Sequence, residues 1–527
     1  MANHKTPIIQ FTRPITLVAI SLLGLVTPSL ALPTASSIGA SGIDALRLHQ
    51  APYNLTGKNI PIGQVEIGRP GLSGWDNTAG PKFQVEQVFY QNQAARPNDD
   101  IQQHAMMVAS VMVGRDTALP GVAPNAKLYA TAIGSPKITG QPEECLSTQY
   151  IAQRAVRAIN LSFGEPLDRD PRPDAKLDGN ALLTQCLDWS ARVHDVLYTV
   201  AGNQGAGGIA IPTDNYNGIT VAAAINRQGI YQQVSPGNRD EPPTENRRPI
   251  GLIAPGANLR LYDLSGSATL VNGTSFAAPH VAGTVALLQE FGDRHLASNN
   301  SNWTLDARRH EVMKAVLLNS TDKLKDNGDG SRLGMSRTIT NKSNRDWLKS
   351  AAYSNPKIPL ESQIGAGQLN AFRAYLAFSA GQHSPTTPVP TIGWNYQSIE
   401  AGAVQDYAID QPLAALSFVS LTLTWDRLVE LQDINGNREY DLGEEFRDRG
   451  LNHLDLYLMR AEDDQIEQSI WSSTSAVDSV QHIFHQVPTA GKYKIRVHFR
   501  QAVNVPKQAY ALAWWTKSAV NRITGSK

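Results

Sequence analysis

The hydrophobic pattern changes near residue 381 and divides the chain into two parts. In the first part, short apolar runs that end in glycine or polar turns alternate with helix-like segments, as at residues 60–68, 158–164 and 196–205. Buried strands that alternate with helices are typical of a parallel sheet with helices on both faces. The sequence therefore predicts an α/β domain that ends by about residue 380.

The second part has a different period. Apolar residues alternate with polar ones at residues 421–425, 454–458 and 493–499, which is the period of strands with one buried face. One-sided strands between turns predict a small antiparallel β-sandwich at residues 392–520. The Pro/Thr-rich residues 381–391 before it predict a semi-extended linker and a domain boundary.

The N-terminal residues have the pattern of a targeting segment. Lys5 and Arg13 precede an apolar run at residues 15–26, and residues 29–31 form a small-x-small cleavage pattern. This predicts a secretory signal peptide at residues 1–31; an uncleaved N-terminal anchor is the alternative. No later stretch is apolar for about 20 residues, so we expect a mature protein without a membrane span, secreted or periplasmic.

The net charge limits which binding partners are expected, and the cysteine content raises the question of a disulfide. The chain of 527 residues has 47 basic and 47 acidic side chains, so electrostatics give no reason to expect nucleic acid as a partner. Cys145 and Cys186 are the two cysteines of a chain that is predicted to be exported, where disulfides persist. Their spacing does not say whether they meet.

Residues 271–288 carry a serine at the start of a small-residue helix. Ser275 follows the turn at Gly273, and alanines and glycine fill the next two turns. Backbone N–H groups in a first helical turn are free and favour negative charge. A serine nucleophile whose attack creates an oxyanion needs such surroundings. A tightly packed helix behind a turn is the alternative interpretation.

Residues 273–283, Gly-Thr-Ser-Phe-Ala-Ala-Pro-His-Val-Ala-Gly, resemble the nucleophile motif of the subtilisin family of serine proteases, the subtilases. The resemblance extends over residues 41–380 and implies a subtilisin-like peptidase domain at residues 32–380, with Ser275 as nucleophile. It also implies the chain order of acid, histidine and serine. The second part resembles the β-sandwich domains that often follow secreted bacterial peptidases.

The resemblance implies that Glu66 is the catalytic acid, at a strand end where the family usually has Asp. The acid must accept a hydrogen bond from the histidine and stabilise the imidazolium, which glutamate can do. Its extra methylene shifts the carboxylate by roughly 1 Å, a displacement that can cost about 10²-fold in rate. A solvated strand-end carboxylate is the alternative. Asp99 and Asp100 are rival acids, ranked lower because a loop places a carboxylate less rigidly.

The same resemblance implies that His104 is the general base. His104, Val108 and Ala109 match the family pattern His-Gly-Thr-x-Val-Ala, whereas Ala105 and Met106 depart from it. A histidine that caps a helix or lies on the surface is the alternative.

Asn203 precedes a glycine-containing turn after an apolar strand, where asparagine is common for its turn geometry alone. In the resembling family, an asparagine at this place donates to the tetrahedral oxyanion, and the backbone N–H of the nucleophilic serine is the second donor. The resemblance therefore implies this role for Asn203 and for the N–H of Ser275.

A segment of the predicted sandwich resembles a calcium loop. Oxygen-bearing side chains alternate from Asp433 to Glu444, but Arg438 stands where such a loop wants glycine, and Gly436 is displaced. A solvated hairpin loop is the preferred interpretation. We expect no cofactor to be required, with a structural calcium ion as the alternative for this loop.

Together these patterns predict a secreted serine endopeptidase that cleaves protein or peptide substrates through an acyl-enzyme. Glu66, the residues after His104 and the lack of room for a long pro-segment after residue 31 motivate an alternative, a catalytically weak protein that binds peptides. A second alternative places the function in the sandwich as a surface-binding module. Exposed aromatic side chains such as Trp471 and Trp515 are the hint for it, and packing in a core explains them as well.

Overall fold

The computed structural model describes residues 32–79, 83, 85–135, 139–203, 209–227, 230–233, 247–298 and 300–520. The predicted signal peptide at residues 1–31 lies outside the described residues. Within the described ranges, every helix is too short or too polar to span a bilayer.

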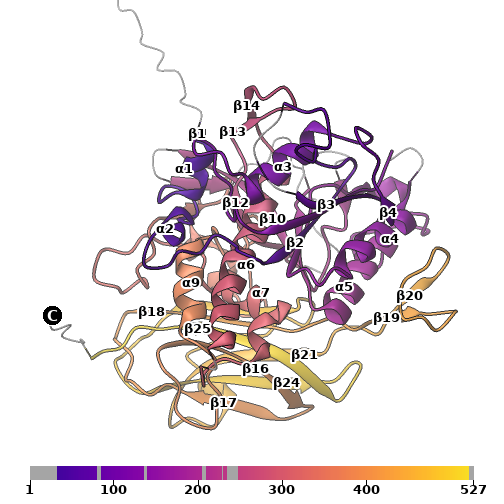
Figure 1. The fold of residues 1–527 in the computed structure, drawn as a ribbon. Coiled ribbons are helices and arrows are strands. Elements are labelled where there is room, and N and C mark those ends of the chain that lie inside the picture. Colours follow the sequence, from indigo (N-terminus) through magenta and orange to yellow (C-terminus); the bar gives the residue numbers. More distant parts are fainter. Residues whose placement is uncertain are drawn as a thin grey trace, which may run out of the picture. The chain divides into compact units, whose positions relative to one another are not determined.

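A large, mostly parallel sheet forms the centre of the first part (Figure 1). Its strands follow the order β15-β11-β10-β8-β6-β2-β5-β3-β4, and β12 also pairs with β10. Neighbours from β10 to β3 run parallel, whereas β11 and β4 pair antiparallel with β10 and β3. The carboxyl ends of the parallel strands therefore lie at one edge, where open α/β sheets place their sites. The bounds are β2 (Pro61–Glu66), β3 (Val85–Tyr90), β4 (Gln93–Ala94), β5 (Lys127–Ala132), β6 (Ala158–Leu161), β8 (Leu197–Ala201), β10 (Ile219–Arg227), β11 (Ile230–Gln233), β12 (Ile250–Pro255) and β15 (Ile339–Thr340).

Helices cover both faces of this sheet. The helices α3 and α6 pack together on one face, and α4 and α5 on the other. Alternate residues of β2 accordingly enter different cores: Ile62 joins the core of α3 and α6, and Val65 joins that of α4 and α5. The predicted fold class is confirmed. The bounds are α3 (Gln103–Val113), α4 (Gln141–Ala152), α5 (Leu182–His194) and α6 (Thr274–Ala297).

A disulfide joins the two helices on the second face. Cys145 of α4 and Cys186 of α5 are bonded, with an S–S distance of 2.04 Å. Cys145 and Cys186 therefore pair, which their spacing in the sequence does not reveal.

The second part forms the predicted antiparallel sandwich from two four-stranded sheets, with a separate hairpin of β19 and β20. The first sheet has the order β16-β25-β18-β23, and the second has the order β17-β24-β21-β22. The bounds are β16 (Ile392–Glu400), β17 (Val404–Ala408), β18 (Phe418–Thr424), β19 (Val429–Gln432), β20 (Glu445–Asp448), β21 (His453–Arg460), β22 (Trp471–Ser473), β23 (Val480–Gln486), β24 (Tyr493–Gln501) and β25 (Lys507–Trp515).

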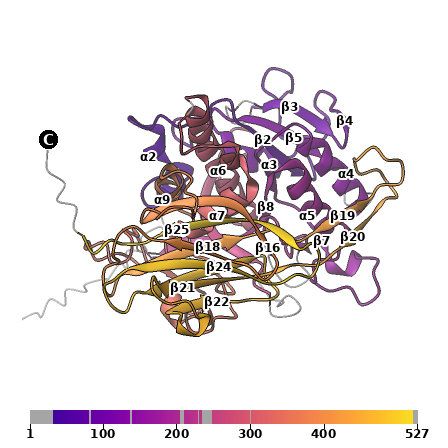
Figure 2. The same ribbon diagram turned by 90° about the horizontal axis from the view of Figure 1, so that it is seen from below.

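The first sheet of the sandwich is buried on both faces, because α7 (His310–Asn319) packs across β18 and β25 (Figure 2). In β18, Leu421 and Leu423 enter the sandwich core. The alternate residues Ser420 and Thr424 donate hydrogen bonds to backbone carbonyls of α7, at 2.8 and 2.9 Å. The alternation thus predicts the apolar face correctly, but the polar face meets a helix and not water.

The two tryptophans that suggest a surface-binding module are not both exposed. Trp515 is buried in the core that it shares with the first part, and the Arg373 guanidinium lies 4.1 Å from its ring centroid. Trp471 is half-buried and stacks on His485, with ring centroids 4.3 Å apart. The expectation of exposed aromatic side chains is therefore wrong for Trp515.

Shorter elements complete the described chain. They are β1 (Leu32–Pro33), α1 (Thr34–Ile38), α2 (Leu46–His49), β7 (Glu165–Pro166), η1 (Leu167–Arg169), β9 (Ile209–Ile211), β13 (Leu259–Tyr262), β14 (Ala268–Val271), η3 (Leu305–Arg308), η4 (Trp347–Lys349), α8 (Ala351–Ser354), α9 (Ala371–Ser379) and η5 (Ile466–Gln468).

Candidate active site

Ser275 lies in the first turn of α6, the helix that crosses the sheet. Its neighbours are small because the packing is tight: a Cβ added to Gly283 would lie 2.6 Å from the Cβ of Val122. The Ser275 side chain is nearly buried, with 7% of the residue exposed. Its backbone N–H belongs to the first helical turn, whose N–H groups have no partner within the helix.

The end of β6 contacts this serine directly. The Ser275 Oγ donates to the carbonyl oxygen of Ser162 at 3.4 Å, and the Ser162 Oγ donates to the carbonyl oxygen of Ser275 at 2.8 Å. Asn160 supports Ser162, since its Nδ2 donates to the Ser162 Oγ at 2.9 Å. Sequence reasoning assigned no role to these two polar residues, although polar side chains in an otherwise apolar strand are a signal that they bond to something specific.

Glu66 and His104 are brought together at the end of β2 and the start of α3. Glu66 is the last residue of β2 and is 1% exposed, and its Oε2 lies 3.2 Å from the Nδ1 of His104. Its Oε1 has no hydrogen-bond partner among the described residues. With Nδ1 directed at the carboxylate, the Nε2 of His104 is the nitrogen left for a reacting group.

His104 stands beside the serine helix. Its ring centroid lies 5.5 Å from that of Phe276, the residue after Ser275. Its side chain is 36% exposed, so substrate and solvent can reach it. Within the described residues the Ser275 Oγ donates to Ser162 and not to His104. Catalytic hydrogen bonds are often long in structures without substrate and tighten when it binds.

The pKa of His104 is raised above its ordinary value of 6.5. Burial by itself acts to lower the pKa, because it disfavours the charged ring. The negative charge of Glu66 and its hydrogen bond outweigh burial and stabilise the imidazolium. That imidazolium is the species that a general base becomes during attack.

The two departures from the family pattern after His104 are both buried. The Sδ of Met106 accepts the backbone N–H of Gly71 at 3.1 Å. The carbonyl of Ala105 accepts the Nε2 of Gln64 at 2.9 Å. The start of α3 is thus fixed against the strand that carries Glu66.

Asn203 follows the last residue of β8 by two positions. The Thr274 Oγ1 donates to the carbonyl of Gly202 at 2.7 Å, and these two residues directly precede Ser275 and Asn203. Asn203 is half-buried, and its Oδ1 has no hydrogen-bond partner among the described residues. Residues 204–208 of the following turn lie outside the described residues.

The rival acids lie elsewhere. Asp99 and Asp100 are both exposed, and the carboxylate that contacts His104 is that of Glu66. The main chain explains the difference, because the segment before α3 pairs with the segment after β2 through an Arg69–Ile101 bridge. Glu66 is thereby held at a strand end, while the two aspartates stay in the loop.

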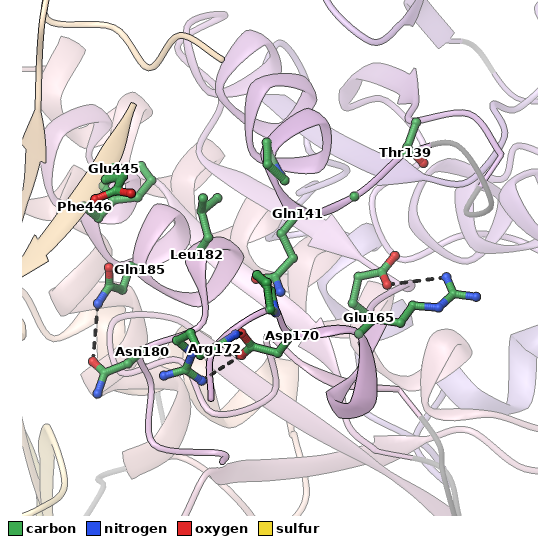
Figure 3. A pocket seen from close by; sticks show the side chains of 14 residues that line it. Thr139, Gln141, Glu165, Asp170, Arg172, Asn180, Leu182, Gln185, Glu445 and Phe446 are labelled. Carbon is green, nitrogen blue, oxygen red and sulfur yellow. Dashed lines mark hydrogen bonds and ion pairs between the residues drawn. The ribbon is translucent and has the colours of Figure 1, made fainter. Parts of the chain in front are cut away.

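A separate pocket of about 990 Å³ lies at the start of α4 (Figure 3). None of the predicted catalytic residues lines it. Four of its charged side chains form ion pairs, Arg169 with Glu165 at 3.6 Å and Arg172 with Asp170 at 2.7 Å, and the fifth, Glu445, is exposed. Phe446 of β20 brings the second part of the chain to its wall. Because both arginines are already paired and none of the predicted catalytic residues is present, we assign the pocket no chemistry.

The loop that resembles a calcium site is held by its own hydrogen bonds. Asp433 accepts backbone N–H groups from Gly436 and Arg438, at 2.6 and 2.8 Å. Asp441 accepts the side-chain amide of Asn437 at 2.7 Å. These bonds are those of an ordered hairpin loop, and calcium binding here stays a prediction.

The model of the Subtilase family matches residues 68–336. The chain belongs to the subtilase family. His104, Asn203 and Ser275 fall inside the matched range, whereas Glu66 lies two residues before it. The predicted family and its enzyme class, serine-type endopeptidases, are confirmed.

Individual subtilases show the extent of the similarity. An alkaline protease of Alkalihalobacillus alcalophilus is 28% identical over 291 residues, which are 54% of this chain and 66% of that protein, just under two thirds of its length. Subtilisin Savinase of Lederbergia lenta is 27% identical over 54% of this chain and 93% of its own. Subtilisin DY of Bacillus licheniformis is 29% identical over 44% of this chain and 77% of its own.

Solved structures are more distant in sequence. The prenylagaramide maturation protease PagA has a TM-score of 0.43 at 18% identity, covering 64% of this chain and 99% of that one. MycP1 from the ESX-1 type VII secretion system has a TM-score of 0.41 at 18% identity, covering 66% and 88%.

Proposed function

We propose that this protein is a secreted serine endopeptidase that hydrolyses peptide bonds through an acyl-enzyme, with Glu66, His104 and Ser275 as its triad. The observation that carries the proposal is the contact of 3.2 Å between the buried Glu66 carboxylate and the Nδ1 of His104, beside the helix of Ser275. Membership of the subtilase family supports the reaction class.

In the proposed reaction, the Ser275 oxygen attacks the peptide carbonyl carbon while the Nε2 of His104 takes its proton. The new C–O bond gives a tetrahedral oxyanion, which accepts hydrogen bonds from Asn203 and the Ser275 N–H. His104 then gives the proton to the leaving amine, the C–N bond breaks, and an acyl-serine remains. Water repeats the sequence on the ester and releases the acid product.

Glu66 acts through His104 throughout. Its carboxylate selects the tautomer with the proton on Nδ1, orients the ring and stabilises the imidazolium. Among the described residues, the Oε2 of Glu66 contacts His104, and its Oε1 has no hydrogen-bond partner.

A fluorophosphonate probe tests the proposal, because only an activated serine attacks its phosphorus, displaces fluoride and becomes phosphonylated. We expect the full chain to be labelled at one site, identified as Ser275 by peptide mass spectrometry, and to cleave casein. Ser275→Ala is expected to lose both. A protein that binds casein, is not labelled at any pH and does not cleave it would overturn the proposal in favour of peptide binding.

A secreted location is part of the proposal and rests on residues 1–31. The disulfide between Cys145 and Cys186 supports it, since disulfides persist in oxidising compartments. Expression in a bacterial host with fractionation tests it: we expect loss of residues 1–31 and accumulation outside the cytoplasm.

A further inference from the structure

A second histidine, on the α-helix that follows the helix of Ser275, is surrounded by carboxylates. His310 is the first residue of α7 and is 2% exposed. Its Nδ1 lies 3.0 Å from the Oδ1 of Asp195 and 3.2 Å from the Oε2 of Glu311. Its Nε2 lies 3.1 Å from each carboxylate oxygen of Asp426. These residues come from the end of α5, the start of α7 and the segment after β18.

One of these carboxylate oxygens lacks a hydrogen bond. Glu311 is 6% exposed, and its Oε2 has no hydrogen-bond donor among the described residues. The Nδ1 of His310 carries at most one proton and already lies closer to Asp195. A buried, unpaired carboxylate oxygen costs free energy unless something else satisfies it. The oxygen lies 3.2 Å from the Nδ1 of His310, the same nitrogen that Asp195 contacts.

The spacing of the three atoms suits a zinc ion. Zinc binds histidine nitrogen and carboxylate oxygen at about 2.0–2.2 Å, which makes the edges of its coordination tetrahedron about 3.3–3.6 Å. The two nitrogen–oxygen distances of 3.0 and 3.2 Å are slightly shorter than such an edge, and all three atoms lie within 4.8 Å of one another. Small movements outward would therefore admit the ion, with water as the fourth ligand.

The surroundings are those of a metal-binding histidine. A histidine ligand almost always donates its other ring N–H to a carboxylate, a backbone carbonyl or water, which fixes the tautomer. Asp426 is 7% exposed and stands at the Nε2 of His310 in this position. The phenol of Tyr396 donates to the Oε1 of Glu311 at 3.4 Å, so the second oxygen of that carboxylate is also oriented.

We propose that Asp195, His310 and Glu311 form a zinc site at the junction of the catalytic part and the sandwich, with Asp426 as the residue that orients His310. The ion would tie α5 and α7 together, and Asp426 would connect it to the sandwich. The site lies outside the triad, so its expected effect is on stability and not on the chemical step.

Zinc binding is measured on the full chain with Ser275→Ala, which prevents self-cleavage. The protein is stripped with a chelator and dialysed against zinc in the presence of excess calcium, and bound zinc is counted by elemental mass spectrometry. We expect one zinc per chain and a rise in Tm. Cobalt in place of zinc is expected to give the visible absorption bands of a tetrahedral site.

Variants assign the ion to this cluster. Glu311→Gln keeps the side-chain volume and is expected to lose the stoichiometric zinc and the rise in Tm. Asp426→Asn is expected to weaken zinc binding by about 10–100-fold. His104→Gln and His482→Gln are the matched controls: the first removes the other histidine–carboxylate pair, the second a buried histidine in the same junction, bonded to Thr422.

Two outcomes would overturn the proposal. The first is a chain that holds no stoichiometric zinc or cobalt, and the second is zinc binding that a folded Glu311→Gln variant leaves unchanged. Either result would make the cluster a protonated histidine that bridges carboxylates. Zinc lost in His104→Gln but kept in Glu311→Gln would assign the ion to the triad instead.

Discussion

Two regions of this protein hold a histidine against buried carboxylate, and they differ in what the second ring nitrogen does. At the corner of β2, α3 and α6, Glu66 engages one nitrogen of His104, and the side chain is 36% exposed. At the junction of α7 and the sandwich, carboxylates engage both nitrogens of the buried His310. A general base needs a free nitrogen that substrate can reach, so only the first arrangement suits proton transfer.

The largest expected effect separates His104 by activity from His482, a buried histidine of the junction. His104→Gln removes the base and is expected to lower kcat by about 10⁶-fold. His482→Gln, a matched change at a buried histidine of the junction, is expected to keep kcat. Peptide hydrolysis by the two purified variants, with folding checked by circular dichroism, makes the comparison. Equal losses in both folded variants would contradict the distinction.

A substitution of Asn203 tests the proposed stabilisation of the oxyanion. Asn203→Ala removes one of the two proposed donors to the oxyanion and is expected to lower kcat by about 10²–10³-fold with little change in KM. Steady-state kinetics on a peptide anilide measure both constants. An unchanged kcat would remove Asn203 from the proposed mechanism.

The raised pKa of His104 predicts the pH profile. The base works as neutral imidazole, so kcat/KM is expected to fall as the pH decreases through a pKa above 6.5. The same interaction contributes to stability fully below the unfolded pKa and is lost as the pH rises through the folded one. In the Glu66→Gln variant, the decrease of kcat/KM at low pH is expected to occur at a lower pH than in the wild type. A decrease at an unchanged pH would argue against coupling between Glu66 and His104.

The smallest expected effect concerns the junction that holds the second histidine. Ser420→Ala removes a buried hydrogen bond from β18 to α7 and is expected to lower the free energy of unfolding by about 1 kcal/mol. Ser398 is exposed on β16 of the same sheet, and Ser398→Ala is the control, expected to change little. Urea unfolding compares them, and equal values would mean that the polar face of β18 contributes nothing specific.

The sequence predicts the surroundings of Glu66, His104 and Ser275 better than it predicts the junction of α7 with the sandwich. Ser275 lies in an ordered motif of eleven residues, and the family resemblance that this motif carries implies the roles of Glu66 and Asn203. Both residues come at or just after strand ends, which meet at one edge of a parallel sheet. Local pattern suffices there because each residue sits next to a recognisable element boundary.

The junction was missed because its signal is not local. Thr424 alternates with leucine as it would on a solvent-facing strand, and burial by α7 depends on a helix more than a hundred residues earlier. Trp515 was interpreted as exposed for the same reason. His310, Glu311 and Asp426 are ordinary polar residues in sequence, and only the packing of α7 on the sandwich brings them together.

The central claim, that the Glu66 carboxylate activates Ser275 through His104, is tested most directly by the rate of fluorophosphonate labelling in Glu66 variants. We expect Glu66→Gln, which keeps the shape but not the charge, to slow labelling of Ser275 by about 10⁴-fold, and Glu66→Asp to retain more of the rate than Glu66→Gln. Labelling of a folded Glu66→Gln variant at the wild-type rate would contradict the account.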